Sequence, residues 1–184
     1  MKVLVTGGAG FIGSHVVDLL VGMDYQVVVV DNLVTGKKEN VNPKAVFREL
    51  DICGPELEDV FNEERPEVVF HLAAQATVPR SVDDPLYDAK VNIAGTLNVL
   101  ELMHQYGSRK IIYSSSAAIY GNPVELPVAE SHPLAPISPY GLSKYVAEEY
   151  IMLYNRMYGL DYTVLRYANV YGPRQTLEGE AGVV

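Results

Sequence analysis

The sequence predicts an α/β fold built on one doubly wound parallel sheet. Short apolar runs rich in valine and isoleucine alternate with stretches of helical periodicity along the chain. A glycine-rich turn, TGGAGFIG at 6–13, joins the first apolar run to the first helical stretch. Parallel strands need crossover connections, so this alternation indicates βαβ units whose helices cover both faces of the sheet.

The elements follow from apolar runs and from their flanking turn residues. Six strands are expected, at 2–6, 25–31, 45–50, 67–74, 110–116 and 161–170. Four helices are expected between them, at 11–22, 57–65, 83–107 and 138–158. The third of these helices is bounded by Pro85 near its start and Gly107 beyond its end, which are typical helix-terminal residues.

Composition narrows the class of protein. The 184 residues suffice for one domain with a sizeable core, and 48% of them are apolar. A net charge of −9 argues against nucleic acid or an anionic membrane as the main partner. No apolar run is long enough to cross a membrane, and the N-terminus reads as a strand and not as a signal peptide, so a cytoplasmic protein is expected. Cys53 is the single cysteine, and the four histidines lack metal-ligand spacing, so no metal site is expected.

The glycine turn has the spacing Gly7-x-x-Gly10-x-x-Gly13. Glycines are needed in such a turn for a tight bend, for close approach of a pyrophosphate and for packing of the helix on the strand. Asp31 ends the second strand 18 residues after Gly13, where a carboxylate can hold the ribose hydroxyls of a dinucleotide and repel a 2′-phosphate. A plain tight turn and a capping aspartate are the alternatives, but the strand–turn–helix context favours a Rossmann-type domain that binds NAD.

A second motif, SPYGLSK at 138–144, begins the last expected helix. Ser138 can cap the helix and Pro139 suits its first position. Tyr140 and Lys144 are then four residues apart on one face, and a nearby ammonium favours the phenolate form of tyrosine. Alone, this pair is as well explained by an ordinary helix start.

Together these motifs resemble the extended short-chain dehydrogenase/reductase superfamily, and within it the UDP-glucose 4-epimerase (UDP-galactose 4-epimerase) family. The stretches that carry the resemblance are VTGGAGFIGSH, DNLVTGK, FHLAAQA, SSSAAIYG, SPYGLSK and LRYANVYGPRQ, between residues 3 and 175.

The resemblance implies roles at the matching positions. Ser116, Tyr140 and Lys144 would be the catalytic residues, and Ser116, Tyr140 and Asn169 would touch the substrate. The same tyrosine and lysine would contact the cofactor. The other cofactor-binding residues would be Gly7, Gly10, Phe11, Ile12, Gly13, Asp31, Asn32, Asp51, Ile52, Leu72, Ala73, Ala74, Gln75, Asn92, Ser114 and Tyr167. For Asn92 a packing role inside the helix is the alternative.

The implied activity is NAD-dependent C4 epimerisation of a UDP-sugar by transient oxidation to the 4-keto sugar. Related dehydratases carry an acidic pair after the catalytic hydroxyl residue, and a related decarboxylase usually carries a glutamate there. Ala117 and Ala118 occupy those positions, which disfavours both reactions. Another NAD(P)-dependent nucleotide-sugar oxidoreductase and a non-catalytic NAD-binding fragment remain alternatives. UDP-glucose, its N-acetyl form and the uronate all remain open as substrates.

The resemblance also implies a domain division and a partner. Residues 1–175 would form the NAD-binding domain with the catalytic residues, and 176–184 would begin a substrate-binding part that the sequence truncates. A homodimer through the helices at 83–107 and 138–158 is expected, with Tyr150, Tyr154 and Tyr158 as either its seam or core packing.

Overall fold

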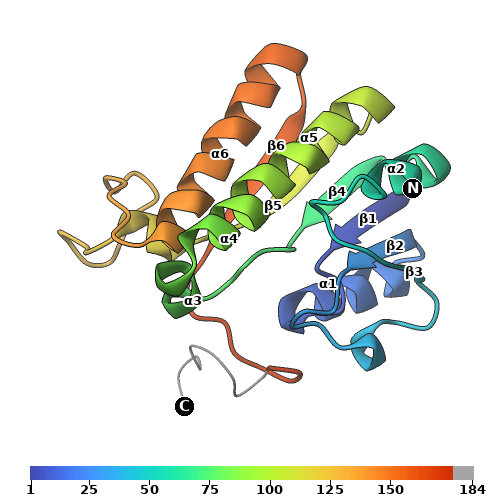
Figure 1. The fold of residues 1–184 in the computed structure, drawn as a ribbon, viewed down its shortest axis with the longest axis horizontal. Coiled ribbons are helices and arrows are strands. Elements are labelled where there is room, and N and C mark those ends of the chain that lie inside the picture. The colour runs from blue at the N-terminus through green and yellow to red at the C-terminus, as the bar shows by residue number, and fades with distance from the viewer. Residues whose placement is uncertain (176–184) are drawn as a thin grey trace.

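The structure, a computed structural model, describes residues 1–175. The expected second part, at 176–184, lies outside the described residues. The described chain forms one sheet of six parallel strands in the order β3-β2-β1-β4-β5-β6 (Figure 1). The strands are β1 (Lys2–Thr6), β2 (Gln26–Asp31), β3 (Val46–Glu49), β4 (Val68–His71), β5 (Lys110–Ser116) and β6 (Asp161–Tyr167). All six expected strands are therefore present, and the predicted fold class is confirmed.

Helices cover both faces of this sheet. The α-helices are α1 (Phe11–Gly22), α2 (Leu57–Glu64), α3 (Val78–Asp83), α4 (Pro85–Ala89), α5 (Gly95–Tyr106) and α6 (Pro139–Tyr158). Three short helices complete the set: η1 (Lys38–Asn40), η2 (Lys90–Ala94) and η3 (Ala117–Tyr120). Figure 1 shows α5 and α6 side by side along β5 and β6.

The core consists of two apolar clusters, one on each face of the sheet. Side chains alternate along a strand, so Val3 and Val5 of β1 pack with Val17 of α1, whereas Leu4 packs with the cluster that contains Met103 of α5. The strand order reverses at β1, because β2 lies on one side of it and β4 on the other. The carboxyl ends of the strands next to such a reversal are where doubly wound folds bind ligands.

The prediction of one continuous α-helix at 83–107 is wrong in detail. This segment consists of α4, the π-helical turn η2 and α5, and the preceding helix α3 was not expected. Asp84 ends α3 and also caps α4, where its carboxylate accepts from the N–H of Tyr87 at 3.0 Å. One widened turn leaves the apolar periodicity almost unchanged, which explains why the sequence pattern does not reveal it.

Candidate dinucleotide and catalytic site

A cleft of about 560 Å³ lies at the carboxyl ends of the strands. Its lining includes the glycine turn after β1, the end of β2, the segment after β4, the end of β5 and the first turns of α6. All the residues for which a catalytic, cofactor or substrate role was expected line this cleft, except Asn92. The volume falls in the usual range of cofactor and small-molecule sites.

The glycine turn is closely packed against the segment that follows β4. Gly7 has a φ of +71°, and a Cβ there would lie 2.6 Å from the backbone nitrogen of Ala73. A Cβ on Gly13 would lie 2.1 Å from the carbonyl oxygen of Gly7. Only glycine satisfies both positions, because the turn and α1 leave no room for a side chain.

The first turn of α1 is open to an anionic ligand. Its N-cap residue is Gly10, which has no side chain and so cannot cap the first N–H groups of the helix. The first N–H groups of a helix have no partners within the helix, and they carry the positive end of its dipole. Phe11, Ile12 and Gly13 line the cleft at this point, so the turn has the form that holds the pyrophosphate of a dinucleotide.

Two carboxylates, from Asp31 and Asp51, line the same cleft as the glycine turn. Asp31 is buried and accepts hydrogen bonds from the N–H groups of Ala9 and Leu33, both at 2.9 Å. Asp51 accepts from the Asn32 amide at 2.9 Å and from the N–H of Cys53 at 2.8 Å. Burial favours a higher pKa for Asp51, but these hydrogen bonds more than offset it and hold its pKa below the usual value. Each carboxylate has four acceptor positions, so both retain capacity for hydroxyl groups of a ligand.

Asn92 lies one layer behind the cleft. It is 2% exposed, and its Oδ1 accepts from the N–H of Gln75 while its Nδ2 donates to the Gln75 carbonyl. The same Nδ2 lies within hydrogen-bonding distance of Asp88 and Ser143. Asn92 therefore does not line the cleft, and its contacts fit the alternative of a packing role inside the helix. Its amide pairs on both sides with the backbone of the segment after β4 and fixes that segment under the cleft.

His71, at the end of β4, joins a buried chain of hydrogen bonds. The Thr96 hydroxyl donates to the Asn92 carbonyl at 2.7 Å, so it accepts from Nε2–H of His71 at 3.0 Å. Nδ1 of His71 therefore accepts from the Thr6 hydroxyl at 2.7 Å. Burial, with a smaller contribution from the Lys144 charge, lowers the pKa of His71 to about 3, and the ring is neutral.

This neutral histidine makes stability depend on pH. Between pH 6.5 and 3 the unfolded chain binds a proton at His71 that the folded chain does not bind, so stability falls as the pH falls through this window. We expect His71 to contribute a loss of up to about 1.4 kcal/mol per pH unit. Urea unfolding at pH 7, 6 and 5 measures the change of the unfolding free energy with pH. His71→Gln should reduce this pH dependence, and His104→Gln, at an exposed position, should leave it unchanged. Equal slopes in the parent and His71→Gln would contradict the assignment.

Lys144 is buried beneath the other half of the cleft. Its Nζ donates to the Ser114 carbonyl at 2.8 Å and lies 4.9 Å from the centre of the Tyr113 ring. Burial lowers the pKa of Lys144 to about 8, although the carboxylates of Asp88 and Glu148 act in the opposite direction. The ammonium is therefore still charged at neutral pH and is held in one place.

The start of α6 brings Tyr140 to the same cleft as Ser116. The Ser138 hydroxyl accepts from the N–H of Gly141 at 3.1 Å, which confirms the expected helix cap. A Cβ on Gly141 would lie 2.6 Å from the Ala118 carbonyl oxygen, so this glycine lets the first turn of α6 contact η3. Ser116 ends β5 immediately before η3, and its Oγ accepts from the N–H of Ala118 at 3.2 Å. The sequence analysis did not identify Gly141. A single glycine in a helix start does not reveal that the Ala118 backbone lies against it.

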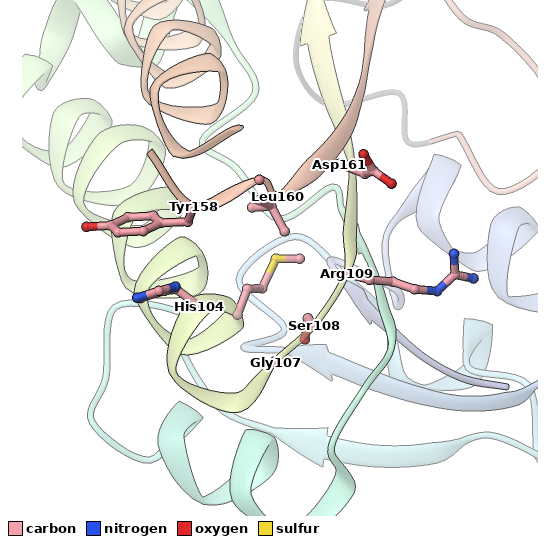
Figure 2. A pocket seen from close by; sticks show the side chains of 9 residues that line it. His104, Gly107, Ser108, Arg109, Tyr158, Leu160 and Asp161 are labelled. Carbon is pink, nitrogen blue, oxygen red and sulfur yellow. The ribbon is translucent and has the colours of Figure 1, made fainter. Parts of the chain in front are cut away.

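A second cavity, of about 250 Å³, lies at the amino ends of β5 and β6, away from the cleft (Figure 2). It is lined by the ends of α5 and α6 and by the starts of β5 and β6, and the His104 and Tyr158 rings stack there at 3.9 Å. None of the residues expected at the catalytic site reaches it. Within residues 1–175, no group of three or more histidine, cysteine or acidic side chains could hold a metal ion, and no helix is both long and apolar enough to cross a membrane.

The fold and the glycine turn define a dinucleotide-binding α/β domain. The sequence matches the family described as the NAD dependent epimerase/dehydratase family over residues 3–184, and the chain belongs to that family. The resemblance to the extended short-chain dehydrogenase/reductases and to the UDP-glucose 4-epimerases is confirmed, and NAD is the cofactor of the family.

Three similar proteins show how far the likeness extends. The crystal structure of UDP-glucose 4-epimerase from Thermotoga maritima with UDP-glucose has a TM-score of 0.96 and 57% identity over 99% of this chain and 60% of its own. The Thermus thermophilus UDP-glucose 4-epimerase in complex with NAD has a TM-score of 0.95 and 49% identity, over 98% of this chain and 59% of its own. UDP-glucose 4-epimerase of Mycolicibacterium smegmatis is 45% identical over 100% of this chain and 61% of its own length. The chain thus spans about 60% of the length of these relatives.

Proposed function

We propose that this chain is the NAD-binding and catalytic part of a nucleotide-sugar C4 epimerase of the UDP-glucose/UDP-galactose type. The observation that carries the proposal is the shared cleft: Ser116, Tyr140 and the buried Lys144 line the same cleft as the glycine turn and Asp31. A binding domain without catalysis has no need of a lysine buried one helical turn from a cleft-lining tyrosine. The relatives that cover this chain are named as UDP-glucose 4-epimerases, which are isomerases.

The residues present fit NAD. The glycine cradle that a Cβ would fill and the open first turn of α1 suit the pyrophosphate, and Asp31 suits the adenosine ribose. When bound, NAD⁺ supplies the hydride acceptor and donor for the sugar carbon. A carboxylate at residue 31 disfavours the 2′-phosphate of NADP by repulsion.

Tyr140 acts as the general base in this proposal. As a phenolate it accepts the proton of the sugar 4-hydroxyl, and it returns that proton after the 4-keto sugar has presented its other face. A tyrosine pKa near 7 requires about 4 kcal/mol of differential stabilisation of the phenolate. The Lys144 ammonium, fixed by the Ser114 carbonyl in a water-poor site, supports that shift. Ser116 donates to the reacting oxygen, and Asn169 contacts the substrate from the segment after β6.

The residues after Ser116 favour simple oxidation and reduction at C4. Expulsion of water from a sugar needs an added acid near the departing hydroxyl group. Ala117 and Ala118 form η3 at this point, and neither carries an ionisable group. Dehydration and acid-assisted decarboxylation are therefore disfavoured relative to epimerisation.

The test is an activity assay with two readouts. The chain is assayed alone and as a chimera with the part of the Thermotoga maritima epimerase that it does not span. Conversion of UDP-galactose to UDP-glucose without net formation of NADH supports epimerisation. Stoichiometric NADH release would identify an oxidoreductase instead, and bound NAD without conversion in either protein would identify a binding domain.

We also propose a homodimer through α4–α5 and α6. The tyrosine stripe does not carry this proposal, because Tyr154 is buried against α5, where its hydroxyl donates to Glu101, and Tyr158 stacks on His104. The support comes instead from exposed apolar side chains on α6, at Leu142, Leu153 and Met157. Light scattering should give the mass of two chains, and the mass of one chain would contradict the proposal.

A further inference from the structure

Glu148 is a buried carboxylate that the proposed mechanism does not use. It is 1% exposed and lies on α6 one turn after Lys144. It accepts a short hydrogen bond from the Ser115 hydroxyl and a bidentate ion pair from Arg166, whose Nη2 lies 2.8 Å from its Oε2. An acidic side chain is rarely buried to this extent unless such partners compensate it.

The two partners of Glu148 come from neighbouring strands. Ser115 of β5 and Arg166 of β6 are opposite each other in the sheet register, and both reach the same carboxylate on α6. Glu148 therefore ties the ends of β5 and β6 to the helix that carries Tyr140 and Lys144. The guanidinium of Arg166 also donates to the Tyr120 hydroxyl at 3.0 Å and to the Glu130 carbonyl at 3.1 Å, so η3 and the segment after it belong to the same network.

Ser115 stands between two residues of the site. Ser114 provides the carbonyl that accepts from Lys144, and Ser116 is the expected catalytic serine. A bond that fixes Ser115 therefore also fixes the backbone on both sides of it. Displacement of this strand end would move the Ser114 carbonyl away from the lysine and would shift Ser116 within the cleft.

The Glu148–Arg166 ion pair also affects the net charge near Tyr140. Lys144 and Glu148 are one turn apart, so an unpaired Glu148 carboxylate would offset the lysine charge that Tyr140 experiences. Arg166 supplies a compensating positive charge through two nitrogens of one guanidinium. Glu148 and Arg166 together have no net charge.

We propose that Glu148 and Arg166 form a neutral positioning pair, which fixes the serine-bearing end of β5 against α6 and leaves the charge of Lys144 free to act on Tyr140. This inference rests on the proposed role of Tyr140 as the base. Glu148 and Arg166 are positioning residues, because they act through Ser115 and Lys144.

The experiment is a spectrophotometric titration of Tyr140 in the 184-residue chain, with and without NAD⁺. Phenolate absorbance is recorded against pH, and the Tyr140→Phe chain is subtracted to remove the absorbance of the other tyrosines. The ionisable groups that face the tyrosine–lysine pair from the packed elements are His71 of β4, Asp88 of α4, Tyr113 of β5, Glu148 of α6 and Tyr167 of β6. Arg166 of β6 contacts Glu148, and Tyr120 of η3 contacts Arg166. Each single variant changes at most one of them, and the double variant changes only Glu148 and Arg166.

The expected shifts have opposite signs. Glu148→Gln leaves Arg166 without its anion and should lower the Tyr140 midpoint by about half a pH unit, whereas Arg166→Met should raise it by a similar amount. The double variant restores local neutrality and should return the midpoint to that of the parent. Glu149→Gln, on the exposed side of α6, removes a carboxylate outside this network and should leave the midpoint in place.

A purely structural role would lower stability in all of these variants without moving the midpoint in two directions. Glu148→Gln and the double variant decide the outcome even if Arg166→Met does not fold. An unchanged or raised midpoint in Glu148→Gln overturns the proposal, and so does a double variant that fails to return to the parent value. Because the readout needs no turnover, a failure of the proposed epimerase activity is distinguishable from a failure of this inference.

Discussion

Tyr140→Phe should lower UDP-galactose turnover by a factor of about 10³ in the chimera while leaving NAD bound. The phenolate oxygen is the only atom removed, and general acid–base catalysis by one positioned side chain typically contributes 10²–10⁴. The ring stays in the first turn of α6, so the cleft wall that contacts the cofactor persists. Turnover and the NAD content of the purified protein are measured on the same sample.

Tyr145→Phe is the matched control for that change. Tyr145 lies on the same helix, does not line the cleft and should tolerate loss of its hydroxyl with turnover unchanged. Residual turnover of the Tyr140→Phe protein above about a tenth of the parent would contradict the assignment of the base. Loss of NAD together with turnover would mean that the hydroxyl group holds the cofactor as well.

Gly13→Ala should abolish NAD binding. The added Cβ would lie 2.1 Å from the Gly7 carbonyl oxygen, a backbone atom, so the backbone itself must shift to accommodate it. Overpacking of this kind costs about 1–3 kcal/mol of stability and moves the first turn of α1 away from the glycine turn. We expect the NAD affinity to fall by a factor of about 100 or more, measured by calorimetric titration, because the pyrophosphate position depends on that turn.

Gly22→Ala provides the control on the same helix. A Cβ there meets nothing within 4 Å, so this change should leave NAD binding intact and raise helix stability slightly. Unchanged NAD affinity in Gly13→Ala would show that the glycine turn is not the pyrophosphate site. Equal loss in both variants would show that the effect comes from helix α1 and not from the turn.

The fold could be predicted because its signals are local. Each strand is a short apolar run and each long helix has a capping residue or a terminal glycine, so the six strands and their parallel arrangement follow from the pattern. Boundaries differ where the chain leaves the sheet for reasons that periodicity does not contain. β4 ends at His71 and not at 74, because the N–H of Ala73 turns to the Thr6 hydroxyl.

The sequence predicted those site residues that belong to a motif and line the cleft themselves. The glycines, Asp31, Tyr140 and Lys144 do, and the sequence motifs identify them. For Asn92 the sequence left a cofactor role and a packing role open, because its two hydrogen bonds to the backbone of Gln75 join segments 17 residues apart. The Glu148–Arg166 pair was missed for a different reason: Glu148 reads as one of two adjacent helix glutamates, and only the register of β5 and β6 brings Arg166 to it.

We expect the described chain to hold NAD in the cleft that its proposed catalytic side chains line. The most direct test is to purify the 184-residue chain, saturate it with NAD⁺, remove free nucleotide, denature the protein and quantify the nucleotide released. About one NAD per chain is expected, and close to none for Gly13→Ala measured in parallel. Absence of NAD from a parent chain whose circular dichroism shows a folded α/β protein would contradict it.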